Sequence, residues 1–245
     1  MGQIITALEP QKRQRDRVSV FLDGEFAFGL PDTEAARLRV GQELSEDAVA
    51  ALRGIDEVTR ALDRAVRLLA RRPYSAAEIR RSLSSKEVAP GVIDEVLARL
   101  TALGYVDDAA FAQYWVENRE RFRPRGARAL RYELRQKGIA DAIISRALDG
   151  YDGAESAYAA AQDQARRLRG LDRRSFRNRL GAFLARRGFD YDTAREAVDR
   201  LVRDLDETDA AFFAGNDAPD DAPDGAINDA ANDTAYEPPD ATDLD

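Results

Sequence analysis

Three stretches of the chain share one apolar pattern: residues 79–97 read IRRSLSSKEVAPGVIDEVL, residues 130–148 read LRYELRQKGIADAIISRAL, and residues 180–198 read LGAFLARRGFDYDTAREAV. Apolar positions follow one another at spacings of 4, 5, 5 and 4 in all three stretches. These positions are Ile79, Leu83, Val88, Ile93 and Leu97, then Leu130, Leu134, Ile139, Ile144 and Leu148, then Leu180, Leu184, Phe189, Ala194 and Val198. Successive copies are offset by 51 and 50 residues, so we interpret the pattern as an internal repeat.

Each repeated stretch predicts two helices, because its apolar residues recur at close to 3.6 residues per turn. Gly138 and Gly188 precede the third apolar position and fit the left-handed residue that ends a helix, whereas Glu87 holds this place in the first copy. A further helix is expected before each pair, at residues 57–71, 108–122 and 154–169. Each unit is then a three-helix bundle, and three tandem units predict an elongated, curved all-α array.

The N-terminal part is the only β-rich portion. Asp23-Gly24 separates two runs of alternating apolar residues, which is a strong hairpin signal. A three-residue connection through Glu25 would place all six apolar residues on one face, whereas a two-residue turn would split them. The six are Val18, Val20, Leu22, Phe26, Phe28 and Leu30. Residues 4–8 could add a third strand, and Ser45 is expected to cap a short helix.

Five segments follow from these patterns: a β-rich extension with short helices at residues 1–56, helical repeats at 57–106, 107–152 and 153–205, and an acidic tail at 206–245. The tail holds 13 acidic residues and no Lys or Arg. It has too few large apolar residues to offset the entropy of ordering, so it is expected to be disordered. The fold class is therefore all-α repeats with a small β-extension and a disordered tail.

Composition removes most kinds of catalysis. His and Cys are both absent, which excludes disulfides, thiol nucleophiles, His-based triads and zinc bound by His or Cys. No phosphate-binding glycine loop is found, and Asp107 and Asp108 fit helix caps better than acid–base or metal groups. We therefore expect no enzyme activity, no cofactor and no metal. Neither a signal peptide nor a membrane span is evident, so a cytoplasmic protein without membrane partners is expected.

Net charge is divided unevenly along the chain. The total is −8, but residues 1–205 carry 37 basic and 32 acidic residues and are mildly basic. This asymmetry suggests an anionic partner and an acidic appendage that is either regulatory or solvating. The tail could fold back on the basic faces and weaken binding, or it could serve solubility alone.

Basic residues gather in two places. The first arginine cluster comprises Arg119, Arg121, Arg123, Arg125, Arg128, Arg131, Arg135 and Lys137. The second arginine cluster comprises Arg166, Arg167, Arg169, Arg173, Arg174, Arg177, Arg179, Arg186 and Arg187. Arg128, Arg131 and Arg135 share one helix face, away from the core positions. Such a stripe can follow phosphates or an acidic protein surface, and the alternative is an ordinary solvated face.

Three motifs follow one another along the chain: Tyr74-Ser75-x-x-Glu78-Ile79-x-x-x-Leu83, Gly104-Tyr105-Val106-Asp107-Asp108-x-x-Phe111 and Gly126-x-x-x-Leu130-x-x-Glu133-Leu134-x-x-Lys137-Gly138-Ile139. In this order they resemble the RecX family, and the resemblance covers about residues 1–203. Residues 20–28, VFLDGEFAF, resemble the β-extension of longer members. The chain departs from the pattern at Glu87, where Gly is expected, and most widely in the third repeat; the acidic tail lies outside the resemblance.

This resemblance implies a regulator of the RecA recombinase, acting in DNA repair and recombination. Such proteins lie in the groove of the RecA–DNA filament and hinder its extension, ATP hydrolysis and strand exchange. The implied partners are the RecA filament and single- or double-stranded DNA, within the filament or weakly alone, and a monomer is expected. Both clusters are candidate binding sites, the first foremost. Two alternatives stay open: a stand-alone DNA-binding repeat protein, and a protein-binding scaffold without nucleic acid.

Overall fold

A four-stranded antiparallel sheet forms one end of the molecule. The computed structural model describes residues 2–12 and 16–214. Its strands are β1 (Gln3–Pro10), β2 (Arg17–Leu22), β3 (Glu25–Pro31) and β4 (Glu43–Leu44), in the order β3-β2-β1-β4. The short helix α1 (Asp32–Ala35) follows β3, and the long helix α2 (Glu46–Leu69) packs its first half against the sheet. The expected third strand at residues 4–8 is confirmed as part of β1.

The hairpin connecting β2 and β3 has the shorter of the two turns considered from the sequence. Leu22 pairs with Glu25, so Asp23 and Gly24 form a two-residue turn, with left-handed φ values of 51° and 91°. A bulge then shifts the register between Phe26 and Phe28. Phe28 returns to the buried face, but Phe26 is 60% exposed and lies edge-on to Phe21. Of the two alternatives, the structure has the two-residue turn, and the bulge limits the split to Phe26, which alone of the six is exposed.

One continuous helix joins the sheet to the first repeat. Ser45 caps α2 as expected, and its hydroxyl accepts a hydrogen bond from the Ala48 N–H at 3.2 Å. The expected break between a short helix and a helix at 57–71 is wrong, because buried residues continue in helical register through the middle of α2. Residue 56, the expected end of the extension, lies inside this helix. Asp56 makes a buried ion pair with Arg17 of β2, which fixes α2 to the sheet.

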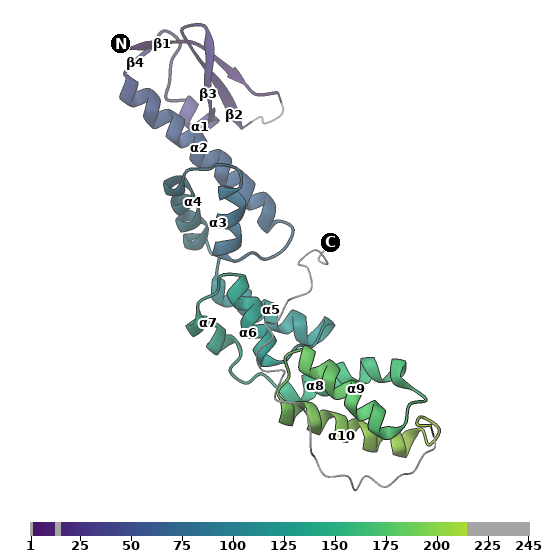
Figure 1. Cartoon of the computed structure of the whole chain (residues 1–245). Helices are drawn as coiled ribbons and strands as arrows, with labels where there is room; N and C mark the ends of the chain where they lie inside the picture. The colour runs from purple at the N-terminus through teal and green to yellow at the C-terminus, as the bar shows by residue number, and fades with distance from the viewer. Residues whose placement is uncertain (1, 13–15, 215–245) are drawn as a thin grey trace.

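Three helical units follow along the elongated molecule (Figure 1). The first combines the end of α2 with α3 (Ala76–Ser84) and α4 (Pro90–Ala102), and the second contains α5 (Asp108–Phe122), α6 (Ala127–Gln136) and α7 (Asp141–Ala147). The third contains α8 (Gly153–Ala165), the 3-10 turn η1 (Arg166–Leu168), α9 (Arg173–Arg186) and α10 (Tyr191–Thr208). Each unit has its own apolar core, and the repeated apolar positions are buried, with Val88 partly so. The all-α repeat fold with a small sheet is confirmed.

The third unit extends further than expected. Helix α10 ends at Thr208, and the next residues return to the core, where Phe212 and Phe213 are 4% and 9% exposed and pack edge-on against Phe176. These two phenylalanines bury enough apolar surface to hold this segment on the third unit. The acidic composition of residues 206–245 as a whole gave no sign of this. The expected start of the tail at residue 206 is therefore too early. The rest of the predicted tail, residues 215–245, lies outside the described residues.

Candidate functional site

The joint between the first and second units seats the end of α6 on the start of α3. The Ser75 hydroxyl donates a hydrogen bond to the Lys137 carbonyl at 2.6 Å. Gly138 has a left-handed φ of 81°, and a Cβ there would lie 2.3 Å from the Cβ of Ala77. The Asp108 carboxylate accepts a hydrogen bond from the Ala76 N–H at 2.9 Å. Asp108 therefore caps α3 of the neighbouring unit, while Asp107 caps its own helix α5.

The joint between the second and third units repeats this arrangement, with a backbone hydrogen bond in place of the Ser75 side-chain bond. The Gly126 N–H donates to the Arg187 carbonyl at 2.9 Å. Arg187 holds the place in the third repeat that Lys137 holds in the second. A Cβ on Gly126 would lie 2.0 Å from the Gly188 carbonyl oxygen. Gly188 has a φ of 83°, which confirms the expected left-handed position. Both joints thus fix the orientation of one unit on the next through close backbone approach.

Three members of the first arginine cluster lie inside the second unit or its joint. The Arg119 guanidinium donates to Glu133 at 2.8 Å, and Arg125 lies 3.7 Å from the same carboxylate. The Lys137 ammonium donates to Glu78 of the first unit at 2.8 Å. Their side chains are only 15%, 17% and 20% exposed. These three residues therefore serve packing and the joint, rather than an open binding face.

Trp115 organises this inward-facing network. Its indole N–H donates to Glu133 at 2.8 Å, while Arg119 and Lys137 lie over its ring at 4.4 and 4.7 Å. The core role expected for Trp115 is confirmed, since it is 5% exposed and stacks on Phe111. Cations above an aromatic face and beside a carboxylate are strongly held.

Glu78 links the first two units electrostatically. It forms a capping box with Ser75 and accepts hydrogen bonds from Arg72 at 3.1 Å as well as from Lys137. Burial on its own would raise the pKa of Glu78, but the hydrogen bonds and charges of Arg72 and Lys137 hold that pKa below its ordinary value. The Ser-x-x-Glu spacing was readable in the sequence, although the partner Lys137 was not.

The remaining five members of the first cluster are exposed. Arg135 donates to Asp141 at 2.7 Å, and this hydrogen bond raises the pKa of Arg135. Within the part of the chain that the structure describes, no carboxylate pairs with the other four, which are Arg121, Arg123, Arg128 and Arg131. Arg128 and Arg131 project from α6 on the side away from buried Leu130. Of the predicted stripe, Arg128 and Arg131 thus have no carboxylate partner among the described residues, whereas Arg135 has one.

The second arginine cluster is partly neutralised by its own unit. Arg169 binds Asp209 at 2.5 Å, Arg173 binds Asp206 at 2.9 Å, and Arg177 pairs with Asp199. Five members are exposed and have no carboxylate partner among the described residues: Arg166, Arg167, Arg174, Arg179 and Arg186.

The two clusters meet at the joint between the second and third units. Arg187 is half-buried there and donates to the Pro124 carbonyl at 3.2 Å. Burial, followed by the nearby charges of Arg125 and Arg123, lowers the pKa of Arg187. Arg187 is more than 60 residues from Arg123 and Arg125 in the sequence, so the sequence did not reveal that they lie close together. Positive charge is therefore found at the joint as well as on the helices on either side.

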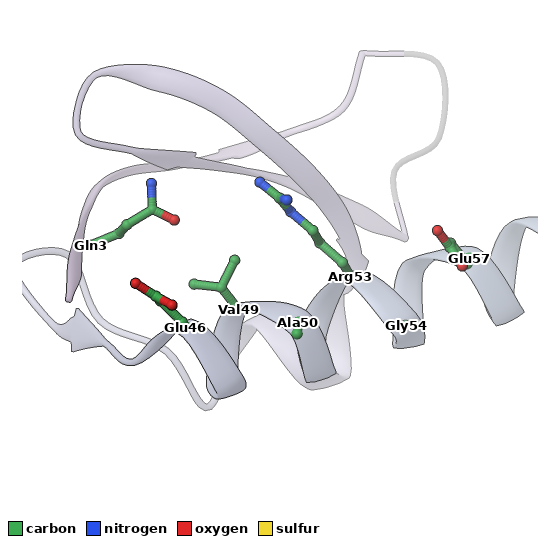
Figure 2. A pocket seen from close by; sticks show the side chains of 7 residues that line it. All are labelled: Gln3, Glu46, Val49, Ala50, Arg53, Gly54 and Glu57. Atoms are coloured by element: carbon green, nitrogen blue, oxygen red, sulfur yellow. The ribbon is translucent and has the colours of Figure 1, made fainter. Parts of the chain in front are cut away.

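A hollow in the N-terminal part lies outside these clusters. This shallow hollow between β1 and α2 is lined by Gln3, Glu46, Arg53 and Glu57 among others, with charges of both signs (Figure 2). Over residues 2–12 and 16–214, no group of three or more acidic residues is placed to hold a metal ion. No helix of this described part is long and apolar enough to cross a membrane.

Comparison with known families accounts for nearly the whole described chain. The model of the regulatory protein RecX N-terminal domain matches residues 3–45. The first, second and third three-helix domains of RecX match residues 61–100, 107–148 and 151–198. The chain belongs to the RecX family.

Relatives and solved structures agree with this membership. A regulatory protein RecX of Chlorobium phaeobacteroides is 42% identical over 144 residues, covering 59% of this chain and 95% of the relative. Regulatory protein RecX of Bacillus subtilis is 30% identical over 208 residues, covering 83% and 79%. A crystal structure of regulatory protein RecX superposes with a TM-score of 0.64 at 27% identity, covering 80% of this chain and 99% of the other. RecX relatives are thus named as regulatory proteins.

Proposed function

We propose that this chain is a modulator, mainly negative, of RecA. It binds in the groove of the RecA–DNA filament and hinders filament extension, ATP hydrolysis and strand exchange. Membership of the RecX family supports this assignment. An elongated row of three similar units also suits a filament, because successive units can meet successive subunits of a helical partner (Figure 1).

The exposed arginines of the second unit carry the proposal. Arg121, Arg123, Arg128 and Arg131 have no carboxylate partner among the described residues, so their charge is available to phosphates or to an acidic protein face. The joints on both sides of this unit fix the position of the backbone that carries these arginines. The proposed binding face of the second unit therefore consists of these four arginines and not of all eight members of the first cluster.

A titration of RecA's single-strand-dependent ATP hydrolysis tests this function. The chain is added below RecA's concentration, beside an Arg128→Ala/Arg131→Ala variant. Inhibition by the wild-type chain is expected to weaken about ten-fold or more in the variant, because loss of two phosphate or carboxylate contacts costs roughly 1–3 kcal/mol. Full inhibition by the variant would contradict the chosen face, and no inhibition by the wild-type chain would contradict RecA modulation itself.

A matched control separates local charge from total charge. Arg39→Ala/Arg53→Ala removes two exposed arginines from the N-terminal part, outside both clusters. This control is expected to inhibit RecA like the wild-type chain. Circular dichroism and thermal unfolding of all three proteins should coincide, because the four arginines replaced are exposed and unpaired among the described residues.

A further inference from the structure

After α10, a short return segment, residues 209–214, is fastened to the third unit. The Gly170 N–H donates to the Phe212 carbonyl at 2.9 Å, and the Ala214 N–H donates to the Leu171 carbonyl at 3.1 Å. Together with the buried rings of Phe212 and Phe213, these bonds hold Ala214 beside the loop that begins α9. Whatever follows Ala214 therefore starts within the second arginine cluster.

Acidic residues at the end of α10 and at the start of the return segment pair with that cluster. Asp209 accepts two hydrogen bonds from Arg169, at 2.5 and 3.2 Å, and Asp206 accepts one from Arg173 at 2.9 Å. Arg169 and Arg173 also lie over the rings of Phe212 and Phe213, at 5.4 and 5.1 Å. The third unit thus binds acidic side chains from the C-terminal end of its own chain.

Further cations lie within five residues of Leu171, whose carbonyl binds the Ala214 N–H. Arg166, Arg167 and Arg174 are exposed, and no carboxylate of the described residues pairs with them. Residues 217–245 contain ten acidic residues and no Lys or Arg. The acidic residues are Asp217, Asp220, Asp221, Asp224, Asp229, Asp233, Glu237, Asp240, Asp243 and Asp245. At ~3.3 Å per residue, those up to Asp224 can extend ~10–30 Å from Ala214, and five residues along the chain from Leu171 span no more than about 20 Å.

We propose that the acidic segment, residues 217–245, binds the exposed arginines Arg166, Arg167 and Arg174 of the same chain and competes there with nucleic-acid phosphates. That nucleic acid is the competitor rests on the proposed function. The contact between the acidic segment and the arginines is independent of that function. Tethering at Ala214 gives the segment an effective concentration of about millimolar, so individually weak ion pairs suffice. Because the pairs are exposed, salt weakens them.

Amide NMR spectra test the contact without any nucleic acid. The full chain is compared with a chain that ends at Ala214 and with a full-length variant whose ten acidic residues in the segment are Asn or Gln. Shifts around Arg166–Arg174 are expected to differ between the full chain and both variants at low salt, and to converge at high salt. Identical spectra at low salt would overturn the proposal. Ending the chain at Ala214 is essential, since a cut at residue 205 would also remove Asp206, Asp209, Phe212 and Phe213.

Competition is measured with a labelled oligo-dT strand. The truncated and neutralised chains are expected to bind it about ten-fold tighter than the full chain at low salt, with the difference vanishing at high salt. Equal affinities at low salt would overturn the competition. If no version binds the strand, nucleic-acid binding outside RecA fails, while the NMR comparison still decides the intramolecular contact.

Discussion

A single position shows how the same backbone requirement is met with different side chains. Glu87, Gly138 and Gly188 are equivalent in the three units, and their φ values are 58°, 81° and 83°. Gly138 and Gly188 also approach the preceding unit closely, whereas exposed Glu87 has no three-helix unit before it. The first repeat therefore tolerates the Glu87 side chain at a position where Gly138 and Gly188 have no room for one. This explains why Glu87 replaces the expected glycine.

Reciprocal substitutions at this position are expected to have opposite effects. Glu87→Gly should raise the free energy of unfolding by about 0.5–1 kcal/mol, since it relieves a left-handed non-glycine residue at some cost in unfolded-chain entropy. Gly138→Ala should lower it by more than ~2 kcal/mol, because the new Cβ is strained and also meets Ala77 at 2.3 Å. Urea denaturation checks both. Equal and small effects would contradict the role given to the joint.

Residue roles were only partly predictable from the sequence. The left-handed glycines, the Asp107 cap and the core position of Trp115 followed from local spacing, and the structure confirms them. The inward orientation of Arg119, Arg125 and Lys137 did not, because it depends on Glu133 and Glu78 arriving from other helices. A run of basic residues has no signature that separates internal from exposed cations before the helices pack.

Elements are coupled across the first joint by Glu78, which gives stability an acid dependence. The pKa of Glu78 is below its ordinary 4.5 in the folded chain. Its contribution is therefore complete above pH 4.5 and is lost as pH falls from there through the folded pKa. Glu78→Gln should lower the free energy of unfolding by roughly 1–3 kcal/mol at pH 7, and by less in acid.

Urea denaturation of wild type and Glu78→Gln at several pH values measures this difference. Lys137→Met is a useful companion, because it removes one partner of Glu78 while keeping a long side chain over Trp115. A constant wild-type to Glu78→Gln difference between neutral and acid pH would show that the Glu78 charge does not stabilise the joint.

Element boundaries were predictable where a strong local signal exists and less so where packing decides. Residues 108–122 were expected as a helix, and α5 has those bounds. The continuity of α2 escaped prediction because Gly54 falls between two apolar runs, yet the helix passes through it. The bulge that exposes Phe26 shifts the register of β2 against β3, and apolar alternation alone does not reveal such a shift. Phe212 and Phe213 were obscured by the acidic composition around them.

At the scale of the whole molecule, the two joints set the relative orientation of the three helical units. Both joints use the end of one middle helix and the start of the preceding one, so exposed arginines of the second and third units keep fixed relative positions. The sheet is fixed at the other end through α2 and the buried Arg17–Asp56 pair. The proposed binding face thus depends on the array as a unit, and an isolated helix would not reproduce it.

The most direct test of the account is a three-way binding measurement with the labelled chain. Its affinity is compared for preformed RecA–single-strand filaments, for RecA alone and for the single strand alone, at the same salt concentration. A RecA modulator is expected to bind the filament much more tightly than either component, and Arg128→Ala/Arg131→Ala is expected to weaken filament binding selectively. Equal affinity for the bare strand and the filament would contradict it and favour a stand-alone DNA-binding protein.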